Sequence, residues 1–141
     1  MSILFYQEEV ELPLLNYDLI SKWLKGILRS NKKQLGSIVY IFCNDDYLLD
    51  INVKFLDHNY LTDIITFDYV DDRIISGDLF ISIERIQENS VLFSSKLEDE
   101  YLRVIVHGLL HLLGYSDHTP EEKSEMKFQE DAMISKFYKY K

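Results

Sequence analysis

The hydrophobic positions in the first part of the chain form two strand-like runs with a helical stripe between them. Residues 3–6 are apolar and predict a strand, and the β-branched and aromatic residues 37–42 predict a buried one. Between them, Asn16 is placed to cap a helix whose apolar residues recur at helical spacing. These residues are Leu19, Ile20, Trp23, Leu24, Ile27 and Leu28. We expect this helix to pack on one face against the strands.

The middle of the chain predicts a further helix and a pair of strands. Asn44 and the two acids after it supply a cap and a first turn for a helix that ends near Leu56. Residues 62–69 and 76–83 both have the composition of strands, with a polar turn at residues 71–73 between them. This spacing predicts an antiparallel pair at one side of the sheet, which would make the sheet mixed.

The last part of the chain predicts two helices. Ser95 with Glu98 forms a capping-box pattern ahead of a long apolar helix over residues 96–113, which Gly114 is expected to end in the left-handed conformation. A second box at residues 119–122 opens a final helix. Its inward residues are predicted to be Met126, Met133 and Phe137.

Length and composition fit these elements into one domain. The 141 residues are 47% hydrophobic and 28% charged, with few glycines and prolines and no linker-like segment. We therefore predict a single domain over residues 1–141 of the α/β or α+β class. It would have a mixed four-stranded sheet, four to five helices and a metal-binding helix like that of the zincins.

Cysteine content and charge limit the compartment and the partners. Cys43 is the only cysteine, and neither a signal peptide nor a membrane-spanning run is found, so we expect a cytoplasmic protein without membrane contact. Asp and Glu number 24 against 15 Lys and Arg, which gives a formal charge of −9. This charge disfavours strong, indiscriminate binding to nucleic acid.

Three of the four histidines lie close together between residues 107 and 118. His107 and His111 are four residues apart, so both imidazoles would share one face of the predicted helix and could bind one zinc ion. Gly114 lets the chain turn sharply, so that Asp117 or His118 can supply the third ligand. Alternatively, the two histidines interrupt a buried helix and are satisfied by carbonyl groups or water. Burial of two unpaired imidazoles on an apolar helix would be costly, which favours the metal site.

A zincin peptidase is the first enzyme class that such a helix suggests. In zincins a glutamate beside the first histidine acts as the general base. Here that position is Gly108, which disfavours the usual peptidase mechanism.

The histidine motif and two further blocks resemble one known family. His-Gly-Leu-Leu-His-Leu-Leu-Gly-Tyr followed by Asp-His, at residues 107–118, looks like the signature of the YbeY family of zinc-dependent, single-strand-specific endoribonucleases. Thr-Asp-Ile-Ile-Thr-Phe at residues 62–67 and Gly-Asp-Leu-Phe-Ile-Ser at residues 77–82 are similar to two other family blocks. The resemblance covers about residues 35–135. It implies a zinc ion, one per chain, and work on ribosomal RNA, including processing of the 16S rRNA 3′ end and ribosome quality control.

Two departures from the family pattern concern the site. The segment between His111 and His118 is one residue longer than usual, which puts Asp117 on the third-ligand position and leaves His118 as the alternative or as a supporting partner. The position of the family's arginine falls on Leu56, four residues after Asn52, which matches a family asparagine. Lys54 or His58 are candidates to replace the missing cation.

Several other side chains are candidates for contact with RNA or for chemistry. The only strongly basic stretch comprises Lys22, Lys25, Arg29, Lys32 and Lys33, which either contact phosphates or complement a helix C-terminus. Asp63 and Asp78 lie in family blocks, and neither is assigned as a general base. Tyr101, Tyr115 and Phe67 are candidates for stacking on unpaired bases.

Together these features predict a metal-dependent endoribonuclease in rRNA maturation. The alternatives are a zincin-like metallopeptidase and a non-catalytic, metal-stabilised ribosome-assembly factor. Expected partners are ribosomal RNA and the ribosome or its proteins, with no DNA. Given the charge of −9, we expect a weak and site-specific encounter with RNA.

Overall fold

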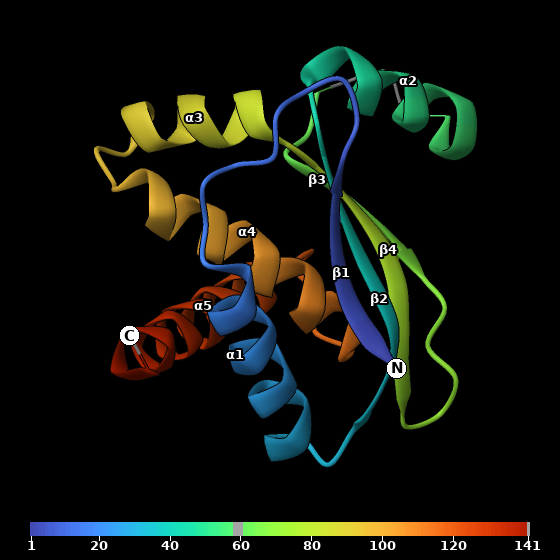
Figure 1. Cartoon of the computed structure of the whole chain (residues 1–141), viewed down its shortest axis with the longest axis vertical. Helices are drawn as coiled ribbons and strands as arrows, with labels where there is room; N and C mark the ends of the chain where they lie inside the picture. Colours follow the sequence, from blue (N-terminus) through green and yellow to red (C-terminus); the bar gives the residue numbers. More distant parts are fainter. Residues whose placement is uncertain (58–60, 141) are drawn as a thin grey trace.

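The structure is a computed structural model that describes residues 1–57 and 61–140. This part of the chain forms four strands and five helices, and their arrangement can be followed in Figure 1. In chain order they are β1 (Ser2–Gln7), α1 (Tyr17–Ser30), β2 (Gln34–Cys43), α2 (Asp45–Leu56), β3 (Ile64–Asp68), β4 (Ile74–Ser82), α3 (Ile83–Leu92), α4 (Leu97–Leu112) and α5 (Pro120–Tyr140).

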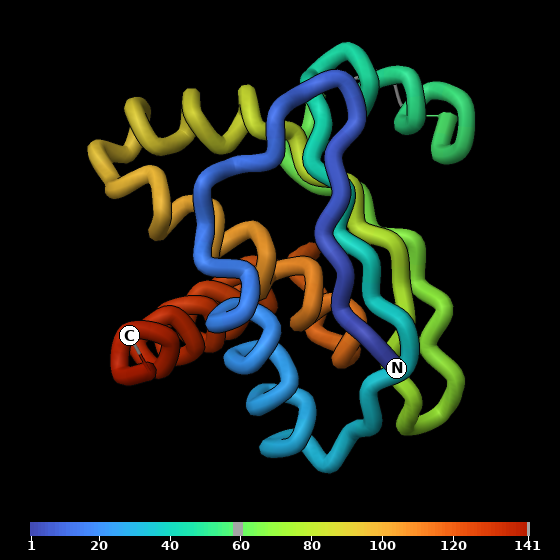
Figure 2. The backbone as a smooth tube through the Cα atoms, in the orientation of Figure 1, coloured from blue at the N-terminus to red at the C-terminus, as the bar shows by residue number. Residues whose placement is uncertain are grey.

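The four strands form one mixed sheet in the order β1-β2-β4-β3. Strands β1 and β4 run parallel to β2, and β3 runs antiparallel to β4 at the edge of the sheet. The predicted mixed sheet and its antiparallel pair are therefore confirmed. The backbone trace in Figure 2 shows α1, α4 and α5 together on one side of the sheet. The main hydrophobic core fills the space between these three helices and the strands.

Two asparagines cap the first two helices as predicted. The Asn16 side chain accepts a hydrogen bond of 3.1 Å from the Leu19 N–H, and Asn44 accepts one of 2.8 Å from the Tyr47 N–H. Each bond satisfies one of the N–H groups that a helix leaves free at its start. Of the six apolar residues predicted for one face of α1, five are buried and Leu19 is half-buried.

The C-terminal helices begin differently from each other. The predicted box at the start of α4 is wrong: Lys96 is the N-cap, without a side-chain cap bond, and the Ser95 hydroxyl donates to Glu100 instead of pairing with Glu98. Glu100 is buried, and this placement draws the serine away from the helix end. The second box is confirmed, because the Glu122 N–H donates to the Thr119 hydroxyl and the Thr119 N–H donates to the Glu122 carboxylate.

Helix α3 was not predicted as a separate element. It has ten residues, and Ile86 is its only buried side chain, so its apolar positions give almost no periodic signal. The Ser82 hydroxyl caps it by accepting a hydrogen bond from the Arg85 N–H. Among the described helices, none has the length and apolar character needed to cross a membrane.

Helix α4 approaches the sheet closely at Gly108. A Cβ atom at this position would collide with Leu79 Cδ2 and would lie 2.9 Å from Ile64 Cδ1. Leu79 is fully buried in β4, so it has little room to withdraw. About one turn earlier in the helix, the Tyr40 hydroxyl of β2 donates to the Ile105 carbonyl at 2.8 Å. These contacts fix the height and rotation of α4 on the sheet, and with them the directions of His107 and His111.

We expect Gly108→Ala to destabilise the protein by about 1–3 kcal/mol, because the added methyl group overfills this contact. The measurement is the free energy of unfolding from urea denaturation. Gly26→Ala is the matched control: its Cβ would lie 3.5 Å from the Tyr140 hydroxyl, an ordinary contact. In the interior of α1 that substitution should stabilise by up to about 1 kcal/mol. Equal effects of the two substitutions would contradict the close packing of α4.

Candidate metal centre

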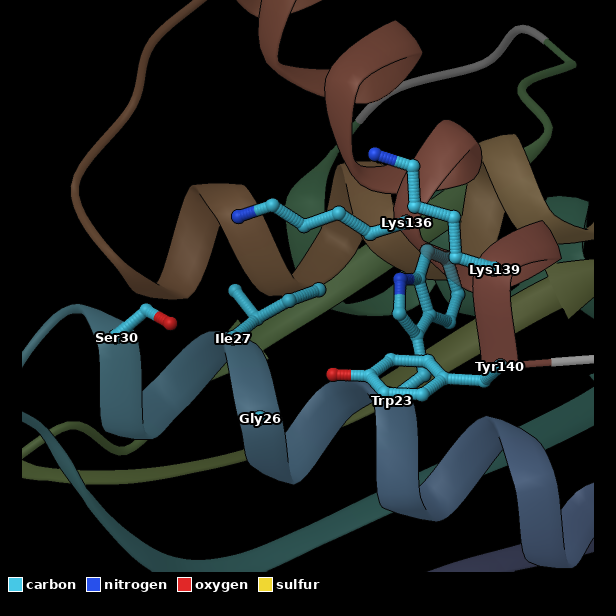
Figure 3. A pocket seen from close by; sticks show the side chains of 7 residues that line it. All are labelled: Trp23, Gly26, Ile27, Ser30, Lys136, Lys139 and Tyr140. Atoms are coloured by element: carbon cyan, nitrogen blue, oxygen red, sulfur yellow. The ribbon is translucent and has the colours of Figure 1, made fainter.

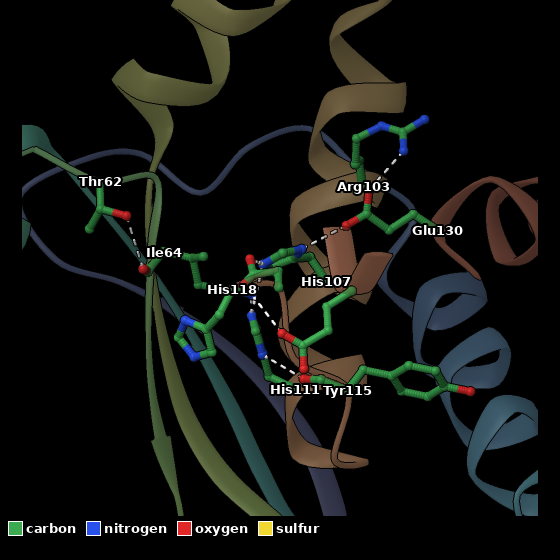
Figure 4. Close-up of polar contacts among 10 residues, drawn as sticks. Thr62, Ile64, Arg103, His107, His111, Tyr115, His118 and Glu130 are labelled. Atoms are coloured by element: carbon green, nitrogen blue, oxygen red, sulfur yellow. Dashed lines mark hydrogen bonds and ion pairs between the residues drawn. The ribbon is translucent and has the colours of Figure 1, made fainter. Parts of the chain in front are cut away.

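His107 and His111 project from consecutive turns at the end of α4. Their rings meet edge to face, with centroids 4.5 Å apart, and the two Nε2 atoms are 2.9 Å apart. Figure 4 shows the two rings turned toward one another, with Glu130 on the far side of His107. Both side chains are partly exposed, so the space beside the Nε2 atoms can be reached from solvent.

The chain turns back toward these histidines at Gly114. This residue has a φ of +101°, and the predicted left-handed helix end is therefore confirmed. The Gly114 N–H donates to the His111 carbonyl and the Tyr115 N–H to the Leu110 carbonyl, each at 3.0 Å. The turn returns Asp117 to the histidines, with its Oδ2 atom 3.4 Å from His107 Nε2 and 3.7 Å from His111 Nε2.

Acceptors on the outer side of each ring determine where the ring protons lie. His111 Nδ1 is 2.9 Å from the Tyr115 carbonyl oxygen, and His107 Nδ1 is 2.6 Å from Glu130 Oε2. A carbonyl or an ionised carboxylate only accepts, so each Nδ1 carries the proton and each neutral ring has a bare Nε2. The hydrogen-bond partners thus assign the same tautomer to both histidines.

Three acceptor atoms therefore converge on one point, two bare Nε2 atoms and a carboxylate oxygen, all within 4.8 Å of one another. Ligands at about 2.0–2.2 Å from a tetrahedral zinc ion are about 3.3–3.6 Å apart, close to the separations from Asp117. Without a cation or a proton these lone pairs would repel one another. The residues present therefore fit a metal ion, and the group His107, His111 and Asp117 could hold one.

The pKa values of the two histidines follow from their surroundings. Burial lowers the pKa of His111, and the neighbouring His107 lowers it further. Burial also opposes a charge on His107, but the hydrogen bond and the negative charge of Glu130 outweigh it and raise the pKa of His107. The acidic surroundings that favour a proton on His107 equally favour a metal cation at its Nε2.

Glu130 is the site residue that the sequence analysis missed. It is a buried carboxylate of α5, bound on one side by His107 and on the other by Arg103 Nη1 at 2.8 Å. Arg103 also reaches Asp131 with its other terminal nitrogen. Glu130 lies at helical spacing from Met126 and Met133 on the inward face of α5. An acid on an apolar helix face was the available signal, because such a group needs a cationic or hydrogen-bonded partner.

His118 is not part of the three-residue group. It is exposed, and its backbone N–H donates to the Glu122 carboxylate at 3.2 Å. Of the two residues considered for the third ligand, the structure thus brings Asp117 to the histidines and leaves the His118 side chain outside the group.

Two cavities flank the group, and His107 and Asp117 line both of them. One, of about 460 Å³, lies along β3 and also contains His111, Asp63 and Asp68. The other, of about 480 Å³, lies against α4 and α5. Its charged residues include Arg103, Lys123 and Lys127. We refer to them as the β3 cavity and the α5 cavity. The candidate metal centre lies where they meet.

The two aspartates from the family blocks have different surroundings. Asp63 lines the β3 cavity, where burial raises its pKa and the charge of His107 opposes that rise. Asp78 belongs to β4 and hydrogen-bonds Tyr69, and it lines neither cavity. The structure therefore brings Asp63, and not Asp78, to the metal-binding group.

The predicted basic stretch lies away from this centre. Arg29, Lys32 and Lys33 line a separate cavity of about 780 Å³, which has no lining residue in common with the β3 or the α5 cavity. Lys22 and Lys25 are exposed on α1. Arg29 stands in the last turn of that helix, where a cation complements the helix dipole. Contact of this stretch with RNA stays a prediction.

Lys54, one of the two residues considered as replacements for the family arginine, lines neither cavity. Leu56 is the exposed last residue of α2, and Lys54 pairs with Asp50 at 3.0 Å on the surface of the same helix. Asn52 is buried in α2. His58 lies outside the described residues.

The aromatic residues proposed for base stacking are mostly engaged in packing. Tyr101 is buried and meets Phe42 edge to face, so its ring is part of the core and is not available to stack on RNA bases. Phe67 packs edge to face against Phe55 and Phe80. Tyr115 is half-buried, and its carbonyl holds His111.

Comparison with known proteins confirms the resemblance found in the sequence. A sequence model of the family described as endoribonuclease YbeY matches residues 3–138. A curated protein named endoribonuclease YbeY from Cytophaga hutchinsonii is 46% identical over 135 residues, 95% of this chain and 94% of that protein. One of the same name from Parabacteroides distasonis is 40% identical over 135 residues, 96% of this chain and 95% of that protein.

The fold has a solved counterpart as well. The solution structure of a Thermotoga maritima protein aligns with a TM-score of 0.67 at 20% identity, covering 99% of this chain and 93% of that chain. This likeness supports the mixed four-stranded sheet with its helices. From the family match and the two relatives, which span nearly the whole chain, we conclude that it belongs to the YbeY endoribonuclease family.

Proposed function

We propose that this protein is a zinc-dependent, single-strand-specific endoribonuclease that acts in rRNA maturation. The observation that carries the proposal is the convergence of His107, His111 and Asp117 on one point between two cavities. Membership of a family described as endoribonuclease supports the reaction class. The substrate would be ribosomal RNA at the 16S 3′ end, met in the setting of the ribosome and also in its quality control, as the sequence resemblance implies.

The donor set supports zinc as the metal. Two imidazoles and one carboxylate are a known combination in catalytic zinc sites, which keep a further position for water or substrate. A bound zinc ion supplies Lewis acidity, which polarises a phosphoryl oxygen and lowers the pKa of a water molecule. The hydrogen bonds from Glu130 and from the Tyr115 carbonyl hold the two rings in the tautomer that leaves Nε2 free.

We further propose that Asp63 accepts the proton of the attacking water. Its carboxylate lines the β3 cavity together with the three metal-binding residues and is not itself one of them. The zincin position for this role is Gly108, where a side chain would collide with Leu79 and Ile64. This packing disfavours the peptidase alternative. It leaves Asp63, the residue before β3, as the available base.

The metal site itself is tested by zinc content. We expect one zinc ion per purified chain, with loss of zinc in His107→Ala, His111→Ala and Asp117→Ala. His118→Ala is the matched control and should keep its zinc, because His118 lies outside the group. Zinc at about a hundred times its dissociation constant should stabilise the wild type by about 2.7 kcal/mol, measured by thermal unfolding. Unchanged zinc content in both histidine variants of α4 would contradict the assignment.

The reaction class is tested with single-stranded RNA. We expect zinc-loaded protein to cleave an internal bond of a single-stranded oligoribonucleotide that carries the 16S rRNA 3′ sequence, and His111→Ala to lose this activity. The activity of a contaminating nuclease would persist in the His111→Ala preparation. Cleavage of casein without cleavage of RNA would favour the peptidase. Inactivity on both substrates, with retained binding to ribosomes, would favour the assembly factor.

The role of Asp63 is tested by Asp63→Asn, which keeps the size of the side chain and removes its basicity. We expect the cleavage rate to fall by about 10²- to 10⁴-fold at unchanged zinc content, as for the loss of a general base. Asp68→Asn is the matched control in the same cavity: Asp68 is exposed and accepts the Val70 N–H at 2.8 Å. Its rate should stay within a few fold of wild type. Wild-type cleavage by Asp63→Asn would refute the proposal.

A further inference from the structure

The α5 cavity contains two lysines that none of its acids neutralises. Lys123 and Lys127 are exposed and stand four residues apart, one turn of α5, so their Cβ atoms are about 5–6 Å apart. Neither takes part in an ion pair among the residues that the structure describes. Both line the cavity that His107 and Asp117 also line.

The acids in the same cavity already have partners. Glu130 is bound by His107 and Arg103, and Glu100 accepts the hydroxyl hydrogen of Ser95. Asp117 belongs to the metal-binding group. The two lysines therefore remain as charges for an anionic ligand beside the candidate metal centre. The cavity lining as a whole is balanced, with Arg103, Lys123 and Lys127 against three acids, whereas the whole chain has a charge of −9.

An exposed aromatic ring stands at the rim of the same cavity. Phe93, the residue directly after α3, is 66% exposed and is the one aromatic residue among the described residues that line the α5 cavity. Exposed rings beside phosphate-binding cations are how proteins hold single strands, since a base stacks on the ring while the cations contact the backbone. A duplex cannot use such a ring, because its bases are stacked on one another.

We propose that the α5 cavity binds the RNA strand on one side of the scissile phosphate. Lys123 and Lys127 contact backbone phosphates, and Phe93 stacks on an unpaired base. This inference rests on the proposed function, since it takes the candidate metal centre to act on RNA. It also supplies the cation that is missing at Leu56, from α5 in place of α2.

Another cavity against α5 also has two lysines and an exposed ring, Tyr140, but it lies away from the candidate metal centre. Figure 3 shows it between α1 and the end of α5, with Lys136 and Lys139 above the ring of Tyr140. It has no lining residue in common with the β3 or the α5 cavity, and its Trp23 is buried, with the indole N–H donating to the Met133 carbonyl. Lys136 and Lys139 therefore provide a matched pair of control lysines on the same helix.

The test is binding of a short fluorescent single-stranded oligoribonucleotide to zinc-loaded protein, followed by anisotropy on ice over a range of salt concentrations. The RNA is recovered after each titration to check that it is intact. For the double variant Lys123→Ala/Lys127→Ala we expect roughly tenfold weaker binding. The slope of log K against log salt should fall by about 1.4, or about 0.7 for each phosphate contact. The double variant Lys136→Ala/Lys139→Ala loses the same charge and should keep the wild-type slope.

Phe93 is tested in the same assay with two substitutions. Phe93→Ala should weaken binding roughly tenfold, within the range for loss of one stacked base, and Phe93→Trp should restore it. A duplex of the same sequence should not respond to either substitution. Because Phe93 and both lysines are exposed, these variants are expected to fold normally, which circular dichroism checks.

The outcomes separate this inference from the proposed function. If the Lys123/Lys127 variant binds with the affinity and salt slope of the Lys136/Lys139 variant, the inference is overturned, whether or not the wild type cleaves RNA. If the lysine and Phe93 variants lose binding as expected while no preparation cleaves RNA, the binding site stands and the proposed reaction falls. Loss in both lysine variants alike would show a general charge effect and would also overturn the inference.

Discussion

The site depends on one electrostatic constraint, the meeting of three electron-pair donors within a space the size of an ion. The Nδ1 partners of His107 and His111 force both bare Nε2 atoms toward Asp117. Other parts of the fold serve this arrangement. The close contact at Gly108 fixes the rotation of α4, the left-handed turn at Gly114 returns the loop, and α5 supplies the buried Glu130. Without a proton or a metal cation between them these lone pairs would repel one another, which suits the group to a positively charged ligand.

The parts of this structure that sequence reasoning captured are those whose causes are local. Apolar periodicity and asparagine caps placed α1 and α2, and the metal-binding residues lie within one helix and the turn after it. The prediction failed where two acids competed for the same hydroxyl group. Ser95 turned to the buried Glu100 instead of capping with Glu98, and no local pattern distinguishes those two acids. Helix α3 buries only Ile86, so it lacked the periodicity by which helices are found.

The partners of the metal-binding residues needed the tertiary structure. Glu130 comes from α5 and Asp63 from the segment before β3, and only the packing of α4 between them brings both to His107. The clustering of cationic side chains on the surface also needed the structure. Sequence draws attention to the dense run of cations from Lys22 to Lys33, whereas Lys123 and Lys127 are interspersed with glutamates and become neighbours only through the helical repeat. Density along a chain is thus a poor guide to density on a surface.

The position of the candidate metal centre between two cavities has a topological consequence. His107 and Asp117 line both cavities, so there is open space on each of two sides of these residues. A pocket closed behind the metal could accept only the terminus of a polymer and would suit stepwise trimming. If RNA occupies both cavities as proposed, the strand crosses the centre with nucleotides on each side, and no free 5′ or 3′ end has to be threaded in. Such an arrangement fits cleavage at an internal bond of the RNA. The bond that is cleaved would then be determined by the molecule that delivers the strand.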